Sequence, residues 1–403
     1  MKHSFRIIIG MLLLAIPLCL NAQVKPVKKD EPKAVKPKTE KPVTPETPEK
    51  PEKPEKPEKP KGGFEMPKIS GFVQTFYTAD LDDNGNLEEN TFKIRRARLS
   101  VDGKLGSRFS YKLQGDFAGT PSLVDAYVKF KACDAFSIQV GQFKTPFTLE
   151  SPINPVNLEI YDYGEAITKL VGYKDVCGVG KLGRDIGIMA SGNLFPIKKG
   201  EGIAYHVVEY SLGVFNGNGA NIVDNNNRKD IVGRLNIHPG LKDLTLSGSY
   251  YNGRYTTDQV DRGARNRWSA GAQYNDGNLI VRAEYLSGTT GYNTVTDSIT
   301  NLITSEDLYH SNGYYAVAGY NFKFGKEKSQ QLMPVFRYEH FIKDASIEKS
   351  GATFYTAGLS YWPIKYVNVK LDYQAKETFT PANDAAYKKV LKHSVIAAVN
   401  FKF

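Results

Sequence analysis

The sequence predicts an all-β protein, a transmembrane antiparallel β-barrel of about sixteen strands with a long third loop folded into the lumen. Three observations carry this prediction. Stretches in which apolar and polar residues alternate recur from residue 68 to the C-terminus, and such alternation places the two kinds of side chain on opposite faces of a strand. The N-terminus has the form of a secretory signal. After it, no apolar run is long enough for a spanning helix.

The first element, residues 1–22, is predicted to be a signal peptide. A basic start, "MKHSFR", is followed by the apolar run "IIIGMLLLAIPLCL" and by "NAQ", which offers a cleavage point after Ala22. An apolar run of this length between such flanks is typical of a secretory signal. Lipidation at Cys19 is the alternative, and the bulky Leu18 before it disfavours that alternative.

The second element, residues 23–63, is predicted to be a disordered periplasmic stalk. Residues 24–61 hold twelve Lys, eight Asp or Glu and ten Pro, with "PEK" repeated. Such a segment has too little apolar surface to form a core and favours extended polyproline II. It is either a plain spacer or a tether that contacts the cell wall. Most of the formal charge of +10 lies in the first 61 residues, so the remainder gives no support for nucleic-acid binding.

Residues 64–403 are predicted to form the barrel. The period-two stretches are 68–78, 92–102, 108–118, 123–131, 136–144, 184–192, 205–215, 231–238, 244–252, 266–274, 279–287, 313–322, 331–341, 352–362, 367–375 and 389–403. Most have the length that a tilted strand needs to cross a bilayer. Short links such as "GKLGS", "ACDA" and "NDGN" alternate with longer ones such as "DLDDNGNLEEN". The links after the third and sixth stretches are exceptions to this alternation.

The apolar face of these strands could contact the core of a soluble sandwich or the lipid of a membrane. In "RFSYKLQGDF" (108–117), Lys112, Gln114 and Asp116 share one face, and apolar residues share the other. Aromatic residues are frequent near the strand ends, as in the interfacial girdles of membrane barrels. The chain ends in "SVIAAVNFKF", and a last strand ending in Phe resembles the assembly signal of outer-membrane barrels. These features favour lipid and lipopolysaccharide as the surroundings, in the outer membrane of a Gram-negative bacterium.

Several stretches together resemble the phosphate-selective porin O and P family. They are "FKIRRARLSVDGKLGSRFSYKLQGDF", "VGQFKTPFTLE", "GRDIGI", "EYSLGVFNGNG" and "LSYWPIKYVNVKLDY". The resemblance extends over most of 66–403 and does not cover the stalk. It implies a sixteen-stranded barrel, a homotrimer, a third loop that narrows the lumen, and selectivity for phosphate.

The candidate site is the lumen wall together with the loop 144–184, because a loop this long in a compact protein is usually functional. Strand parity gives a slight excess of inward-facing cations over anions. The wall cations are Arg96, Arg98, Lys112, Lys129, Arg234, Arg267, Arg282, Arg337 and Lys370. The wall anions are Asp102, Asp116, Asp125, Glu284, Glu339 and Asp372. The loop is of mixed sign. Its cations are Lys169, Lys174, Lys181 and Arg184, and its anions are Glu150, Glu159, Asp162, Glu165 and Asp175. Parity places Arg95, next to Arg96, on the outside, where it would extend toward lipid headgroups.

Other chemistries receive less support from the sequence. "GVGKLG" (178–183) matches a dinucleotide fingerprint, but the residues after it have the period of a strand rather than a helix. "DLDDNG" (80–85) begins like a calcium loop, but Thr91 stands at the closing position. The histidines lack metal-ligand spacing. We therefore expect no enzyme, no metal and no cofactor. Cys133 and Cys177 could pair or remain free.

The predicted function is an outer-membrane porin, with a water-filled channel for passive diffusion of small anionic or polar solutes and a modest preference for anions. The alternative is an outer-membrane barrel that serves as an anchor between the membrane and the cell wall or a partner. A channel conducts ions and a filled anchor does not, so bilayer conductance separates the two.

Overall fold

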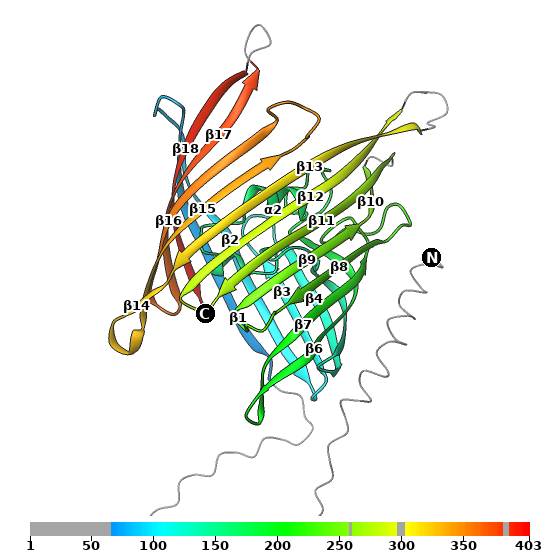
Figure 1. The fold of residues 1–403 in the computed structure, drawn as a ribbon, viewed down its shortest axis with the longest axis vertical. Helices are drawn as coiled ribbons and strands as arrows, with labels where there is room; N and C mark the ends of the chain where they lie inside the picture. Colours follow the sequence, from blue (N-terminus) through cyan, green and yellow to red (C-terminus); the bar gives the residue numbers. More distant parts are fainter. Residues whose placement is uncertain (1–65, 258–259, 296–302, 382–386) are drawn as a thin grey trace, which may run out of the picture.

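A computed structural model describes residues 66–257, 260–295, 303–381 and 387–403. The predicted signal peptide (1–22) and the predicted stalk (23–63) therefore lie outside the described residues. One sheet contains all the strands (Figure 1). They are β1 (Lys68–Leu81), β2 (Leu87–Leu105), β3 (Phe109–Asp116), β4 (Ser122–Cys133), β5 (Phe136–Lys144), β6 (Arg184–Lys199), β7 (Gly202–Phe215), β8 (Asp230–Ile237), β9 (Leu244–Asn252), β10 (Arg254–Thr257), β11 (Val260–Asn275), β12 (Leu279–Val295), β13 (Ile303–Tyr320), β14 (Phe322–Phe324), β15 (Gln330–Ile342), β16 (Gly351–Ile364), β17 (Val367–Pro381) and β18 (Tyr387–Lys402).

The sheet closes into a barrel. The first strand, β1, pairs antiparallel with its sequence neighbour β2 and also with the last strand, β18. Two positions in the wall are each filled by two pieces of strand, since β9 and β10 both pair with β11, and β13 and β14 both pair with β15. The wall is therefore a closed antiparallel barrel of sixteen strands, as the sequence predicts. Closure leaves no strand edge to pair with another chain.

Several strands are longer than the period-two stretches indicate. The stretches 184–192 and 205–215 extend toward each other, so that Lys199 faces Gly202 across a tight turn. The apparent long link after the sixth stretch is therefore a short turn. The short turns lie at one end of the barrel and the longer connections at the other, which is the arrangement of outer-membrane barrels.

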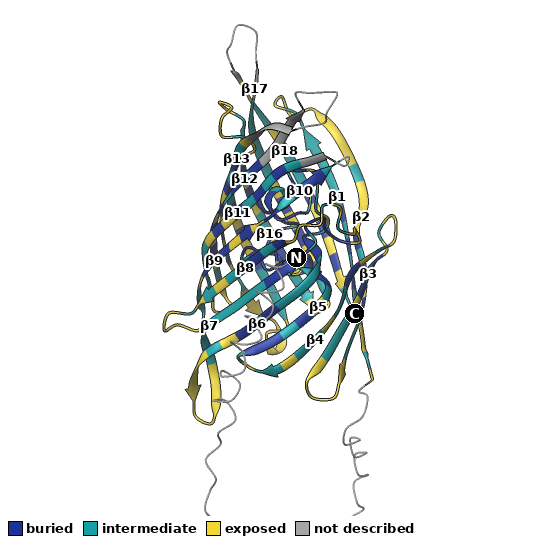
Figure 2. Cartoon of the chain, turned by 90° about the vertical axis from the view of Figure 1, so that its right-hand side faces the viewer, coloured by how far each residue is buried: buried dark blue, intermediate teal, exposed yellow. Residues whose placement is uncertain are grey.

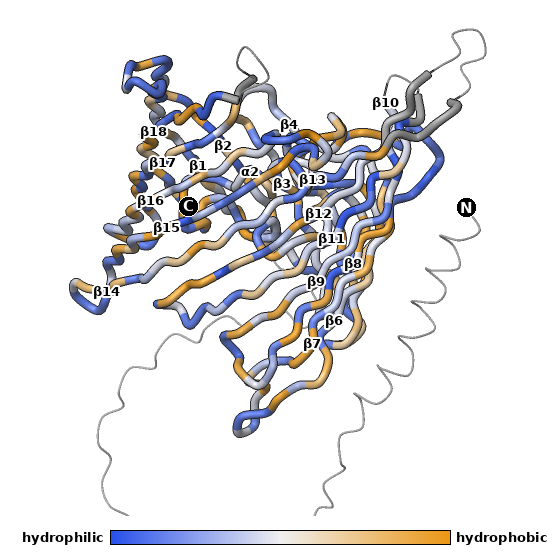
Figure 3. The backbone as a smooth tube through the Cα atoms, turned by 45° about the horizontal axis from the view of Figure 1, so that its top comes forward, coloured by the Kyte–Doolittle hydropathy of each residue, from blue (hydrophilic) through white to orange (hydrophobic). Residues whose placement is uncertain are grey.

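The two faces of the wall differ as the alternation predicts. In β15 and β16, buried and exposed positions alternate along the strand, and Figure 2 shows the same alternation over the neighbouring strands. Phe336 and Leu113 are about half exposed on the outside. Hydrophilic residues gather at turns such as those beside β7 and β14 (Figure 3).

An aromatic row runs around much of the outside. Cross-strand neighbours in this row include Trp268 with Tyr285, Tyr285 with Tyr314, and Tyr338 with Tyr355. The row spans β9 to β17 and consists of Tyr250, Trp268, Tyr285, Tyr314, Tyr338, Tyr355 and Tyr373. From β3 to β8, by contrast, the strongly exposed aromatic residues that the structure describes are all Phe, and Tyr111, on the outer face of β3, is only partly exposed.

The connection between β5 and β6, residues 145–183, is named the inner segment here. It contains the 3-10 turn η1 (Pro155–Asn157) and the short helix α2 (Glu165–Leu170); a second 3-10 turn, η2 (Lys326–Lys328), lies elsewhere, between β14 and β15. The main apolar core lies where the inner segment packs against the wall. Leu158, Ile167 and Leu170 of the segment share this core with wall residues such as Leu286 and Val317. Apolar side chains on the lumen face of these strands thus hold the segment.

No helix among the described residues is long and apolar enough to cross a membrane.

Candidate functional site

The inner segment binds the lumen face of many strands, which places it inside the barrel. Its backbone N–H groups donate to side chains of β9, β12, β15 and β17. These bonds run from Thr148 to Ser249, Leu149 to Glu284, Ala166 to Glu339, and Tyr161 to Asp372. A segment that contacts strands around so much of the circumference must lie in the lumen. These contacts agree with the predicted position of the long loop in the lumen.

Buried arginines of the wall bind carboxylates of the inner segment. Arg337 donates through Nη1 to Glu150 at 2.6 Å. Arg282 contacts both Glu150, at 3.2 Å, and Glu159, at 2.7 Å. Arg267 of β11 binds Asp175 through both terminal nitrogens, at 2.5 and 2.7 Å. These charge-assisted bonds are the strong kind, and they neutralise the arginines with which they form.

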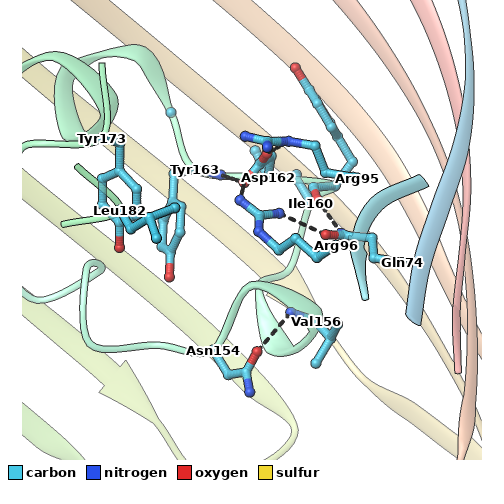
Figure 4. A network of polar contacts seen from close by, with 12 residues as sticks. Gln74, Arg95, Arg96, Asn154, Val156, Ile160, Asp162, Tyr163, Tyr173 and Leu182 are labelled. Carbon is cyan, nitrogen blue, oxygen red and sulfur yellow. Dashed lines mark hydrogen bonds and ion pairs between the residues drawn. The ribbon is translucent and has the colours of Figure 1, made fainter. Parts of the chain in front are cut away.

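Arg95 and Arg96 both point into the lumen, contrary to the prediction for Arg95. The register between β1 and β2 shifts at Gln74, so Arg96 pairs with Gln74 and Ile94 with Thr75, leaving Arg95 as the extra residue of a bulge. Asp162 of the inner segment accepts from Arg95 at 3.0 Å and from Arg96 at 2.8 Å (Figure 4). The prediction that Arg95 extends toward lipid is wrong, because the bulge interrupts the parity on which it rested.

Two lysines hold the inner segment through its carbonyl groups. Lys144 donates to the carbonyls of Ser151 and Ile153 and to the Tyr163 hydroxyl, at 2.5, 2.9 and 2.9 Å. Lys370 donates to the carbonyls of Leu158 and Ile160 at 2.5 and 2.8 Å. All these acceptors are neutral, so neither ammonium charge is cancelled by the groups that it binds directly.

Three carboxylates of the inner segment, those of Glu150, Asp162 and Asp175, are held in their ionised form. Burial raises the pKa of Glu150, but the guanidinium groups of Arg337 and Arg282 outweigh it, and the net pKa is below the ordinary value. The same balance lowers the pKa of Asp162 beside Arg96, and that of Asp175 beside Arg267. The ion pairs therefore persist at neutral pH.

A cavity of about 270 Å³ lies between the inner segment and strands β2–β6. It is named the loop-side cavity here. Four cations line it, Arg98, Lys112, Lys144 and Arg184, with Asp125 as the one acidic residue of the lining. The rest of the lining is Gln114, Tyr127, Gln139, Phe143, Pro152, Asn154, Pro155 and Met189. The wall of this cavity is thus richer in positive than in negative charge.

Three of the four cations have acidic partners on the wall. Arg98 binds Asp116 at 2.8 Å, Lys112 binds Asp102 at 3.1 Å, and Arg184 binds Asp125 at 2.7 Å. Lys144 has only the neutral acceptors described above. Its charge is therefore the excess positive charge of the loop-side cavity.

A second cavity, of about 300 Å³, lies closer to the short turns and is named the turn-side cavity here. Met189 lines both cavities, so they adjoin along the wall. Lys129, Lys131 and Arg234 supply its positive charge, and Asp134 and Glu209 its negative charge. Together the two cavities mark a polar path beside β2–β8.

The residues predicted as lumen candidates fall into three groups. Arg98, Lys112, Asp125 and Arg184 line the loop-side cavity, with Asp116 behind Arg98, while Lys129 and Arg234 line the turn-side cavity. Arg96, Arg267, Arg282 and Lys370 are buried beneath the inner segment. Lys169, Lys174 and Lys181 belong to the inner segment and are not among the residues that line either cavity.

The sequence reasoning missed Lys144, the lysine of "VGQFKTPFTLE". Its position at the junction between a strand and the long loop was the available signal, since a side chain there can reach the loop. It also missed Gln139 and Tyr127, which lie on the lumen-facing sides of their strands and line the same cavity.

Among the described residues, no group of three or more His, Cys, Asp or Glu is placed to hold a metal ion. Cys133 and Cys177 are unpaired. Cys177 lies buried in the inner segment, where its Sγ is 3.2 Å from Nη2 of Arg267. Burial raises the pKa of this thiol to about 12, which keeps it protonated.

Comparison with known families gives a match over nearly the whole described chain. The model of the family described as phosphate-selective porin O and P matches residues 68–401. Among curated proteins, none matches.

Solved structures share the fold at low sequence identity. An anion-selective porin from Comamonas acidovorans superposes with a TM-score of 0.58 at 13% identity, over 84% of this chain and 99% of that one. The outer-membrane channel DcaP of Acinetobacter baumannii gives 0.53 at 12%, over 86% and 99%. OmpF of Salmonella typhi, in complex with daunomycin, gives 0.55 at 14%, over 84% and 97%.

Proposed function

This chain belongs to the phosphate-selective porin O and P family and forms an outer-membrane porin channel, for which we propose a modest preference for anions. The carrying observation is the charge of the loop-side cavity, where Lys144 adds a cation that no wall carboxylate matches. A narrow passage between walls of low dielectric focuses the field of such a charge on a passing solute. The anchor function is not favoured, and the proposal includes no catalytic step.

The test is the reversal potential of the full-length protein in a planar bilayer across a salt gradient. We expect an anion-selective potential for wild type and a shift toward cations for Lys144→Met. A unit charge about 6 Å from an ion in water-like surroundings contributes about 0.7 kcal/mol, which is roughly a threefold change in permeability. A cation-selective wild-type channel would reject the proposal.

Lys370→Met is the matched control. Lys370, like Lys144, is an ammonium bound to two carbonyls of the inner segment, so its loss loosens the segment in a similar way. It does not line either cavity. We expect its selectivity to stay near that of wild type. Equal shifts in the two variants would show that loosening of the segment, and not the charge of Lys144, sets the selectivity.

We also propose that the channel is a homotrimer whose contact surface lies around β2–β5. Among the described residues there, the strongly exposed aromatic side chains are Phe and not the Tyr and Trp of the aromatic row. The same part of the wall has an apolar groove of about 370 Å³, lined by Leu99, Val101, Leu113, Gly115, Phe117, Pro121, Ser122 and Leu123. One of the structurally similar porins, OmpT of Vibrio cholerae, is described in a trimer form.

The mass of the detergent-solubilised protein tests this surface. Leu113→Arg should abolish the trimer, because it introduces a charge into the groove. Leu371→Arg, at an outward position that is similarly exposed on β17, should leave the trimer intact. A monomeric wild type, or a trimer that survives Leu113→Arg, would reject the assignment.

For the N-terminal part of the chain we propose a signal peptide over 1–22 and a periplasmic stalk over 23–63. The sequence supports this, because the segment is extended in character and precedes the first strand of a barrel with an even number of strands. We further propose contact of the stalk with the cell wall, and contact of the barrel surface with lipopolysaccharide.

A further inference from the structure

The loop-side cavity combines cations with an apolar surface. Arg98, Lys112 and Lys144 lie on the same cavity as Tyr127 and Met189. Phe143, Pro152 and Pro155 complete the apolar part of the lining. An inorganic anion gains from the cations but loses hydration against the apolar surface, without any compensating burial. A solute that has both an anionic group and an apolar body can use both kinds of surface.

The apolar surface is held in place by packing. Phe143 is 3% exposed and meets the Tyr127 ring edge to face, with ring centroids 5.9 Å apart. The Phe143 ring also packs edge to face against Phe215, at 5.5 Å. Tyr127 remains only partly buried, so its ring is presented to the lumen from a fixed position.

The polar side of the cavity offers donors that can bind an anionic group. Arg98 lines the cavity and binds Asp116 through Nε. The Lys112 side chain is 25% exposed beside Asp102. Gln139, from the neighbouring strand β5, adds an amide to the same lining.

Met189 continues the apolar surface toward the turn-side cavity, because it lines both cavities. The next cations along the wall, Lys129 and Arg234, lie in that second cavity. An organic anion can therefore exchange the first set of cations for the second while its apolar body stays in contact with Met189.

We propose that the channel favours organic anions that carry an apolar or aromatic body over small inorganic anions of the same charge. The anionic group binds at Arg98 and Lys112, and the body lies against Tyr127 and Met189. This inference rests on the proposed anion preference and names the class of solute that benefits from it.

The experiment measures block of the chloride current through the full-length protein in a planar bilayer. Benzenesulfonate and methanesulfonate are the probes, because they share one permanently ionised group and differ in the body attached to it. Inorganic phosphate is added as a third anion. We expect benzenesulfonate to halve the current at a concentration at least threefold lower than methanesulfonate or phosphate does, a ratio in keeping with one aromatic contact.

Variants locate the effect. Tyr127→Ser and Met189→Ser remove apolar surface without changing charge, and each should weaken the block by benzenesulfonate about threefold while leaving the block by methanesulfonate unchanged. Tyr127→Phe and Met189→Leu keep the apolar surface and should behave as wild type. The chloride conductance of each variant reports that the channel has assembled.

The outcomes separate this inference from the proposed function. A cation-selective wild-type channel would overturn both. An anion-selective channel that the two sulfonates block equally would overturn the inference alone. A benzenesulfonate preference that persists in both serine variants would overturn its assignment to this cavity.

Discussion

Oε2 of Glu150 accepts a hydrogen bond from Nη1 of Arg337 at 2.6 Å, and the two side chains are 0% and 2% exposed. Removal of one member of a buried pair leaves the other charge without compensation, at a typical cost of about 3–5 kcal/mol. We expect Arg337→Met to destabilise the protein by about 3 kcal/mol, because Glu150 keeps its contact with Arg282. Denaturant unfolding in detergent measures the change.

Two variants control this prediction. Arg337→Met combined with Glu150→Gln should recover part of the lost stability, since Glu150 is then uncharged, while buried Glu339 still lacks its contact with Arg337. Lys392→Met removes an exposed pair with Glu88 and should have no measurable effect. If Arg337→Met were as stable as Lys392→Met, the pair would not hold the inner segment.

The two faces of the wall should respond differently to the same new side chain. Leu371 is 54% exposed on the outside of β17, between the aromatic residues Tyr366 and Tyr373. Leu371→Arg should cost about 2–4 kcal/mol, as expected for a cation near the middle of the lipid layer. Gln139→Arg, which places the arginine in the loop-side cavity, should cost far less. Refolding titrations into lipid vesicles compare the two, and equal costs would contradict the assignment of faces.

The ion pairs between arginines of the wall and carboxylates of the inner segment should be insensitive to pH over the neutral range. Its carboxylates at Glu150, Asp162 and Asp175 have pKa values below their ordinary 4.5 and 3.8. A lowered pKa stabilises the docked state fully above the ordinary value, and that stabilisation is lost as pH falls through the value in the folded protein. A change in open-channel conductance or current noise that comes from loss of these three ion pairs should therefore appear only below about pH 4. A transition between pH 7 and pH 5 would show that other groups control the segment.

The predicted stalk should be dispensable for assembly. Deletion of residues 24–61, with the signal peptide kept, should leave the folded fraction and the conductance unchanged, because this segment has almost no apolar side chains to pack. Heat-modifiable migration in gels measures the folded fraction. A truncated protein that fails to fold would mean that the segment takes part in assembly.

The alternation of apolar and polar residues was sufficient to predict the strands of the wall, since the face that carries the apolar residues is the one that contacts lipid. The alternation in 108–117 and 389–403 placed Lys112 and Asp116 inside and Val399 and Phe401 outside, and the exposures agree. Parity failed at Arg95, because a bulge inserts one residue, and nothing in "KIRRARLS" marks where it lies.

The division of the lumen could not be predicted, because it depends on contacts between residues that are distant in the sequence. Arg282 and Arg98 have the same local context in the sequence, since each lies on the polar, lumen-facing side of its strand. The first is matched by Glu159, 123 residues away, while the second is bound to Asp116 and lines a cavity. Only the course of the inner segment distinguishes them, and a loop of mixed charge can follow many courses.

The backbone of Tyr161 joins the two ends of the barrel. Its carbonyl accepts from Gln74 of β1, and its N–H donates to Asp372 of β17, so one residue of the inner segment lies across the seam where β18 meets β1. These partners come together only when the last strands have joined the first. The inner segment therefore docks late in the biogenesis of the barrel. Once docked, it links β17 to β1 across the seam and so opposes opening of the barrel there.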